Sequence, residues 1–155
     1  MVNSRPENAV MSVPAIPMQK INRFFETYAR ALEHYDTKGM AYLYHTPCTL
    51  ASDDSSTVFN DAGRLEGFFN MGVGFYRQFG IANVRHEIWN RREWTDKIIN
   101  VKVNWQYLDS FKTPIYNCDY QYVLKLDKND YWKILLSVSI NEKERIEEWK
   151  RKAKG

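Results

Sequence analysis

The sequence has little cysteine, glycine or proline, and it has no long apolar run. Its 155 residues include two cysteines, seven glycines and five prolines. Cys48 and Cys118 lie far apart without a CxxC spacing, which is typical neither of a zinc site nor of a secreted disulfide framework. No stretch has the length and hydropathy of a signal peptide or of a membrane-spanning helix. We therefore expect a cytoplasmic protein that has no membrane contact.

The part of the chain before residue 141 also has little excess of positive over negative charge. The formal net charge is +3, and residues 141–155 hold six Lys or Arg against four Glu. Most of the excess charge thus lies in this last segment, whereas nucleic-acid binding needs a basic stripe on one face of the protein. We expect no nucleic-acid partner.

Motifs for metals and cofactors are missing as well. His45 and Cys48 lie three residues apart, but no HxH or CxxC pattern completes a set of ligands. The Gly72-Val-Gly74 segment lies inside a helical pattern and lacks the third glycine of a dinucleotide-binding loop. The sequence therefore predicts neither a metal nor a cofactor.

What the sequence has is apolar and aromatic bulk in regular patterns. Hydrophobic residues make up 44% of the chain and aromatic residues 15%, which is enough for one sizeable core. We expect a single domain over residues 18–141. A flexible arm with three prolines precedes it over residues 1–17, and a charged helical tail follows over residues 142–155.

Apolar spacing of three and four residues predicts helices in the first half of the chain. The first helix begins at Met18, and its buried face consists of Ile21, Phe24, Phe25, Tyr28, Leu32 and Tyr35. Asp36 can cap a second, shorter helix that ends before Pro47. Asn60 and Asp61 can cap a third helix that continues to Gly80.

Three glycines within the third helix are unusual. Gly67, Gly72 and Gly74 each weaken a helix by up to about 1 kcal/mol relative to alanine. We infer that they allow close packing of the helix against a sheet, and fraying of the helix is the alternative.

Strand patterns occupy residues 48–53 and most of the second half of the chain. Four runs with a period of two cover residues 83–94, 97–108, 115–126 and 131–141, and their short connections predict an antiparallel meander. One face of the second run contains Ile99, Val101, Val103, Trp105 and Tyr107. The corresponding face of the third run begins with Tyr116, Cys118, Tyr120 and Tyr122, and that of the fourth contains Trp132, Ile134, Leu136, Val138 and Ile140.

This order of elements predicts an α+β domain with its helices on one face of the sheet. The segments FFETYARALEHYDTKGMAYLYHTPCTL and LKLDKNDYWKILLSV resemble the first helices and strand and the last hairpin of the nuclear transport factor 2-like (NTF2-like) superfamily. Ketosteroid isomerase, scytalone dehydratase and the SnoaL-like polyketide cyclases belong to it. The resemblance implies a cone-shaped fold with N-terminal helices on a curved, mainly antiparallel sheet. It also implies a pocket inside the cone and a homodimer formed through the outer sheet face.

The resemblance can be followed residue by residue at the site of the isomerases. Tyr28 matches their tyrosine donor. The position of their aspartate base falls on Ser52, which cannot abstract a carbon-bound proton, and the neighbouring Asp53 points to the other face unless a bulge intervenes. The position of their acidic donor falls near Tyr122, with Tyr120 on the same face. Ketosteroid isomerase activity is therefore not expected.

The remaining pattern is a cavity with hydroxyl donors. We expect Tyr28, Ser52, Tyr120 and Tyr122 to bind the ligand, with Phe24, Trp105, Tyr107 and Cys118 in the wall. Such a site suits a small apolar molecule that bears one or two oxygens.

The sequence does not decide whether the protein is an enzyme. Proton-transfer chemistry, such as isomerisation, cyclisation or dehydration, is what the resemblance implies, with Tyr28 as donor and His86 as the candidate base. Asp53 could take the place of His86 through a bulge. In the alternative interpretation the aromatic residues simply fill the cone, and the chain is a non-catalytic interaction module.

Overall fold

Six strands and four helices form the part of the chain that the structure describes. The computed structural model describes residues 16–155. The first fifteen residues of the predicted arm lie outside this range. In chain order the elements are α2 (Met18–Glu33), α3 (Thr37–Tyr42), β1 (Tyr44–Ala51), β2 (Ser56–Phe59), α4 (Ala62–Phe79), β3 (Asn83–Glu93), β4 (Ile98–Leu108), β5 (Pro114–Leu126), β6 (Trp132–Ser139) and α5 (Glu142–Lys154).

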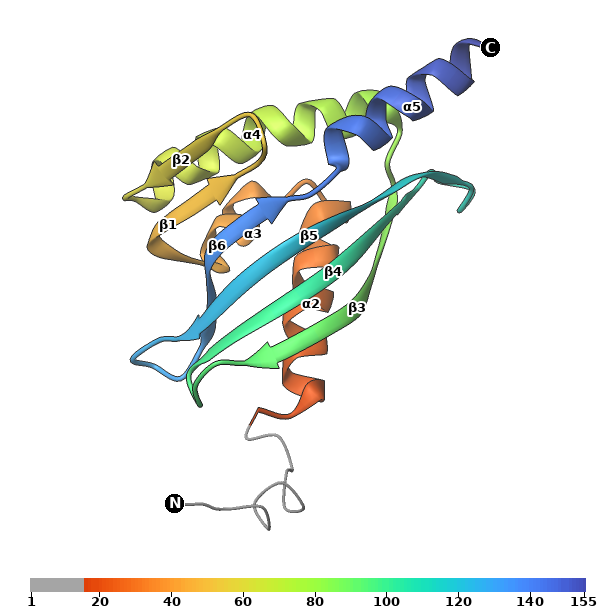
Figure 1. Ribbon diagram of the computed structural model, residues 1–155. Helices are drawn as coiled ribbons and strands as arrows, with labels where there is room; N and C mark the ends of the chain where they lie inside the picture. Colours follow the sequence, from red (N-terminus) through yellow and green to blue (C-terminus); the bar gives the residue numbers. More distant parts are fainter. Residues whose placement is uncertain (1–15) are drawn as a thin grey trace.

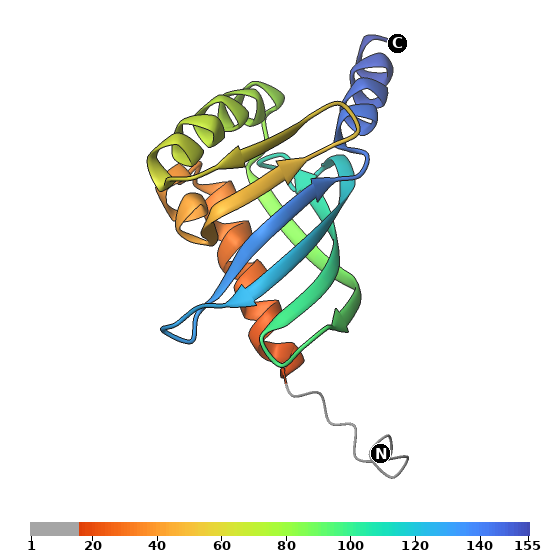
Figure 2. The same ribbon diagram turned by 60° about the vertical axis from the view of Figure 1, so that its left-hand side comes forward.

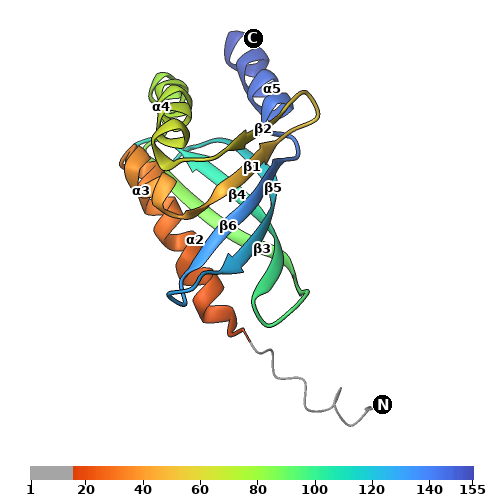
Figure 3. The ribbon, with the colours of Figure 1, turned by 90° about the vertical axis from the view of Figure 1, so that its left-hand side faces the viewer.

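The strands form one curved sheet in the order β2-β1-β6-β5-β4-β3. All neighbours are antiparallel except β1 and β6, which are parallel. Helix α2 runs across one face of the sheet (Figures 1 and 2), and α4 and α5 lie at the same end of the molecule (Figure 3). The predicted α+β cone is confirmed.

Helix α2 is held against the sheet by its apolar face and by two polar side chains. Ile21 and Phe25 are fully buried. Arg30 donates to the carbonyl oxygen of Val84 at 2.7 Å, and Glu33 accepts from the amide of the same residue at 2.8 Å. These two side chains satisfy backbone groups of the edge strand β3 that no further strand can pair.

A bulge in β6 reverses the side-chain pattern that the sequence predicts. Leu136 pairs with Val123 whereas Ile134 pairs with Leu124, so Leu135 is an extra residue in the ladder. Beyond a bulge every side chain changes face. Ser137 therefore faces the core and is 4% exposed. Placing Leu136, Val138 and Ile140 on the same face as Ile134 was wrong.

The region between the second helix and α4 also differs from the prediction. The second helix ends at Tyr42, and β1 begins at Tyr44, earlier than the expected strand over residues 48–53. Residues 56–59 form strand β2, which the sequence did not predict, and Ser56 pairs with Ala51 across a tight hairpin. Short polar strands at a sheet edge carry little apolar signal, which is why the pattern missed β2.

The glycines of α4 do not serve close packing. A Cβ atom added at Gly67, Gly72 or Gly74 would meet no atom within 4 Å, so the inference of tight contact with the sheet was wrong. The helix stands away from the sheet, and it leaves Phe68 and Phe75 47% and 55% exposed. This position leaves room for a cavity between α4 and the inner face of the sheet.

Candidate functional site

A cavity of about 410 Å³ lies inside the cone, with α2, α4, α5 and the inner sheet face contributing to its wall. Much of the wall is aromatic, and Tyr28, Tyr44, Phe69, Tyr76, Trp105, Tyr107, Tyr120 and Tyr122 line it. The volume is in the range of cavities that bind small molecules, which are mostly apolar with a few polar groups that fix orientation. Two groups of polar side chains stand out in this wall.

The first group is a chain of hydroxyls that connects α2 with the sheet. The Tyr28 and Tyr44 hydroxyl oxygens lie 2.6 Å apart. Two hydroxyls joined by one hydrogen bond leave one hydrogen over. When Tyr44 donates to Tyr28, the hydroxyl of Tyr28 is free to donate to a ligand.

Tyr122 supplies a second donor in the same wall. Its hydroxyl oxygen accepts the indole N–H of Trp105 at 2.9 Å, and its own hydrogen has no acceptor among residues 16–155. Tyr122 is 2% exposed, and a buried polar hydrogen without a partner is costly. The hydrogen is therefore available to a molecule in the cavity.

Both donors keep their protons at neutral pH. Desolvation by burial raises the pKa of Tyr28 and of Tyr122 well above that of a free tyrosine, and neighbouring tyrosines raise the pKa of Tyr28 further. The two rings are neighbours, with centroids 6.3 Å apart. We call Tyr28 and Tyr122 the donor pair.

The second polar group is a carboxylate that gathers three phenols. Oε2 of Glu142 accepts the hydroxyls of Tyr76 and Tyr116, each at 2.7 Å, and Oε1 accepts that of Tyr120 at 2.5 Å. Burial, followed by the charge of Glu142, raises the pKa of all three tyrosines. We call Glu142 and its three phenols the carboxylate cluster.

The carboxylate cluster and the donor pair are close to each other. The rings of Tyr120 and Tyr122 are stacked, with centroids 5.7 Å apart and an angle of 14° between their planes. The cavity thus offers the hydroxyl of Tyr122 as a hydrogen-bond donor and, beside the Tyr120 ring, the carboxylate of Glu142 as a charged acceptor.

The sequence did not indicate Glu142, because this residue was assigned to the charged tail. Its neighbour Asn141 fixes the start of α5: the Asn141 side chain accepts from the amide of Asp119 at 2.8 Å and donates to the Asp119 carboxylate at 2.9 Å. Further along, the Trp149 ring packs on Phe79 with centroids 5.2 Å apart. The only local signal of this role was that Glu142 is the first residue of a helix that begins shortly after a strand.

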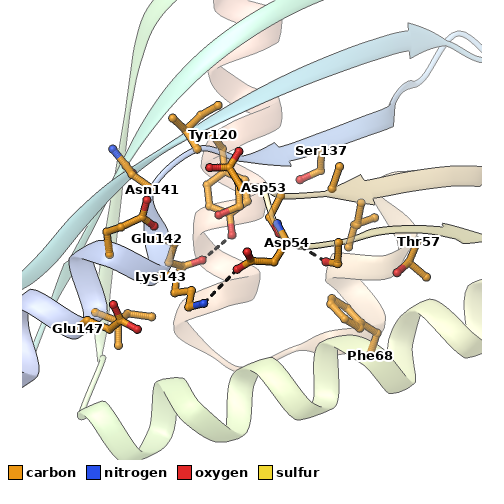
Figure 4. A pocket seen from close by; sticks show the side chains of 18 of the residues that line it. Asp53, Asp54, Thr57, Phe68, Tyr120, Ser137, Asn141, Glu142, Lys143 and Glu147 are labelled. Atoms are coloured by element: carbon orange, nitrogen blue, oxygen red, sulfur yellow. Dashed lines mark hydrogen bonds and ion pairs between the residues drawn. The ribbon is translucent and has the colours of Figure 1, made fainter.

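A groove of about 730 Å³ adjoins the cavity and shares Tyr120, Ser137 and Glu142 with it. It lies between the β1–β2 turn and the beginning of α5 (Figure 4). Lys143 bridges the two sides through an ion pair with Asp54 at 3.1 Å. Most residues that line this groove are polar or charged, with Leu50, Phe68, Ile140 and Ile146 among the apolar ones, whereas the cavity is largely aromatic.

The structure brings together most of the predicted ligand-binding residues. Tyr28, Trp105, Tyr107, Tyr120 and Tyr122 line the cavity. Ser52 lines the groove, where its hydroxyl accepts the amide of Asp54 at 3.3 Å. Phe24 and Cys118 are buried in the core and do not line the cavity.

His86 lies outside the cavity, between α2 and β3. Its Nε2 lies 3.3 Å from Oδ1 of Asn22, and its Nδ1 lies 3.6 Å from a carboxylate oxygen of Glu26. Desolvation lowers its pKa, opposed by the charge of Glu26. The carboxylate beside His86 is therefore on α2, while Glu87 accepts from Trp89 instead.

Within residues 16–155, no group of three or more His, Cys, Asp or Glu side chains is placed to hold a metal ion. No described helix combines the length and the apolar character needed to cross a membrane. Burial raises the pKa of Cys48 to about 11.

The comparisons with known proteins identify the family of the chain. Residues 19–142 match the family described as NTF2-like protein (DUF6841), so the chain belongs to this NTF2-like family. The match ends at Glu142, the first residue of α5. No curated protein matches the sequence.

Solved structures share the fold at low sequence identity. An NTF2-like protein of unknown function from Shewanella oneidensis is 13% identical with a TM-score of 0.64, over 81% of this chain and 99% of that one. A ketosteroid isomerase-like protein from Erwinia carotovora atroseptica is 12% identical with a TM-score of 0.60, over 79% and 94%. The beta subunit of the benzoate 1,2-dioxygenase from Burkholderia mallei is 20% identical with a TM-score of 0.58, over 81% and 90%.

Proposed function

We propose that this protein binds a small, mostly apolar molecule with at least one oxygen acceptor inside its cone. The observation that carries the proposal is the hydroxyl hydrogen of Tyr122, which is buried in the cavity wall without a protein acceptor in the described chain. A ligand carbonyl or phenol oxygen would satisfy it. Tyr28 would donate to the same oxygen or to a neighbouring one.

Two phenol donors on one oxygen can do more than bind. They stabilise negative charge on that oxygen, which is the requirement of enolisation and related proton transfers. Isomerisation, cyclisation or dehydration is therefore the class of reaction that we assign if the ligand is turned over. The ketosteroid isomerase-like neighbour is in keeping with this class.

Binding is supported more strongly than turnover, because the described residues offer no free base beside the donor pair. Glu142 lines the cavity, but three of its about four acceptor positions already hold phenol hydrogens. His86 lies between α2 and β3 outside the cavity, and Asp53 is in the groove. Ligand binding without turnover is thus the primary proposal, and a cytoplasmic location stays a prediction.

The second candidate function is association through the outer sheet face, as a homodimer. The specific observation is an apolar strip that the bulge of β6 places there, formed by Leu136, Val138 and Ile140. By register, Thr49 of β1 separates Leu136 from Val58 of β2, which is 56% exposed. One structural neighbour is named as a subunit of a larger enzyme. Light scattering tests this candidate, and a monomer mass at high concentration would contradict it.

A thermal-shift screen tests the primary proposal. The panel consists of planar ketones, phenols, steroids and small carboxylates, against the wild type, Tyr28→Phe and Tyr122→Phe. A ligand at 100 times its dissociation constant adds about 2.7 kcal/mol to stability, which raises the unfolding midpoint visibly. Tyr131→Phe is the control, since this tyrosine is 58% exposed and does not line the cavity.

The proposal expects at least one compound whose shift is kept in Tyr131→Phe and is greatly reduced in Tyr122→Phe. No shift across the panel would favour the interaction module. A shift that survives in both cavity variants would show binding elsewhere on the protein.

A further inference from the structure

We propose that the molecule bound in the cone carries a positive charge, an amine or a quaternary ammonium group, and that Glu142 is its counter-charge. This inference rests on the proposed function, since it names the ligand class of the same cavity. Three independent features carry it: the open position on the Glu142 carboxylate, the charge of the groove that leads to it, and the aromatic faces around it.

The Glu142 carboxylate has neutral partners only. Its three contacts are phenol hydroxyls, and within residues 16–155 it takes part in none of the ion pairs. A carboxylate has about four acceptor positions. Oε2 uses two of them for Tyr76 and Tyr116, and Oε1 uses one for Tyr120. One position on Oε1 is left for a donor from the cavity or groove.

The groove that adjoins the cavity is acidic, although the chain as a whole has a net charge of +3. Besides Glu142, four carboxylates and two lysines line it: Asp53, Asp54, Glu144 and Glu147 with Lys143 and Lys150, and Asp54 is paired with Lys143. Clefts lined by one sign of charge raise the local concentration of the opposite charge. The approach to Glu142 therefore favours cations over anions.

The wall beside Glu142 suits a cation in a third way. The rings of Tyr76 and Tyr107 lie 5.2 Å apart between centroids, and both line the cavity together with Phe79. Ring faces attract ammonium groups, most strongly where water is excluded. Phe79 already has such a contact, because the ammonium nitrogen of Lys150 lies 5.5 Å from its ring centroid.

Lys150 would favour a ligand of the opposite, negative charge. It is one of the two lysines that line the groove, and it could pair with a ligand carboxylate. A ligand with the negative charge would then bind best, and the test below distinguishes the two outcomes.

The test compares three probes that share one hydroxylated ring and differ in the charge of the side chain. Serotonin is cationic, 5-hydroxytryptophol is neutral, and 5-hydroxyindole-3-acetate is anionic. Each carries a ring hydroxyl oxygen that can accept a hydrogen bond from the donor pair. Calorimetric titration of the full chain at low ionic strength should give serotonin at least about tenfold tighter than the neutral probe and the anion weakest. Equal affinities, or the anion tightest, would overturn the proposal.

Variants test whether Glu142 and the acidic groove cause the preference for the cationic probe. Glu142→Gln removes the charge and keeps an acceptor, so the preference for serotonin over 5-hydroxytryptophol should fall to about twofold or less. Because this variant also alters the carboxylate cluster, a second variant changes only exposed groove residues: Asp53→Asn with Glu147→Gln should reduce the preference in part and leave 5-hydroxytryptophol binding unchanged. Glu148→Gln is the control, an exposed glutamate of α5 outside the groove.

Failure of this inference can be told apart from failure of the proposed function. If neutral ketones or phenols of the thermal-shift panel bind and are sensitive to Tyr122→Phe, but serotonin binds no better than its neutral counterpart, the cation proposal is wrong and the cavity remains a binding site. If neither the panel nor the three probes bind, both proposals fail.

Discussion

Replacing Glu142 by alanine should destabilise the protein far more than any other glutamate of α5. The substitution removes the acceptor of three tyrosine hydroxyls at once. Tyr116 is 8% exposed and has no other hydrogen-bond partner among the described residues. Its hydroxyl would be left buried and unpaired, which is the costly outcome of deleting one partner.

The magnitude follows from what the three phenols can do without Glu142. A hydrogen bond to a charged group contributes roughly 1.5–3 kcal/mol, and an unsatisfied buried donor costs about 1–3 kcal/mol. Tyr76 keeps a contact with the hydroxyl of Tyr107 at 3.3 Å, and Tyr120 lines the groove, where water can replace the carboxylate. The net loss in Glu142→Ala is therefore about 2–4 kcal/mol, and about half of that in Glu142→Gln, whose amide oxygen still accepts.

Urea denaturation followed by tryptophan fluorescence measures this loss, with the m-value checked for two-state behaviour. Glu144→Ala is the matched control, because it removes an equal charge from the same first turn of α5 and so shares any effect of the helix dipole. If Glu142→Ala unfolds within about 0.5 kcal/mol of Glu144→Ala, the carboxylate cluster does not stabilise the fold as described, and the reasoning is refuted.

Three further predictions concern other parts of the molecule. Gly67→Ala should raise the free energy of unfolding by about 0.5–1 kcal/mol, because an added Cβ meets nothing within 4 Å on the exposed side of α4. Gly80→Ala should lower the free energy of unfolding, because Gly80 has a φ of +80°. Urea denaturation of both variants measures these changes, and their opposite signs check the helix geometry. His86 has a lowered pKa in the folded state, so the unfolded state binds more protons, and the wild type should lose stability relative to His86→Gln as the pH falls below about 6.5. Melting temperatures measured between pH 7 and pH 5 check this, with His34→Gln, at an exposed histidine, as the control. Parallel curves of melting temperature against pH for the wild type and His86→Gln would contradict it. Asn141→Ala should cost about 1–3 kcal/mol by removing both contacts with Asp119, and an unchanged midpoint in denaturant would show that α5 is fixed by its apolar contacts instead.

Much of the fold could be predicted because its signals are local. The alternation from Ile99 to Tyr107 marks the buried face of β4, and all five residues named for that face are buried. Asp36 and Asp61 cap their helices as expected, with side chains that accept from Gly39 and Arg64. Periodicity and capping depend on neighbours in the chain, so the sequence carries them directly.

The missed features depend on contacts between distant segments. Ser137 reaches the cavity only because the bulge at Leu135 reverses the faces of β6, and no residue type at the bulge announces it. Glu142 is in a charged segment that looks like a solvated tail, and its role arises from three tyrosines on α4 and β5. The donor pair could be proposed in advance only through the family resemblance, which supplied the positions of Tyr28 and Tyr122.

The central claim is that the space inside the cone is a binding site, and filling that space tests it most directly. Gly72 lines the cavity and has no atom within 4 Å of an added Cβ, whereas Gly67, on the same helix and equally unobstructed, does not line it. We would measure the affinity of the panel compound with the largest thermal shift for Gly72→Leu and Gly67→Leu. The account predicts that Gly72→Leu loses binding while it stays folded, and that Gly67→Leu binds like the wild type. Equal binding by both variants would contradict it.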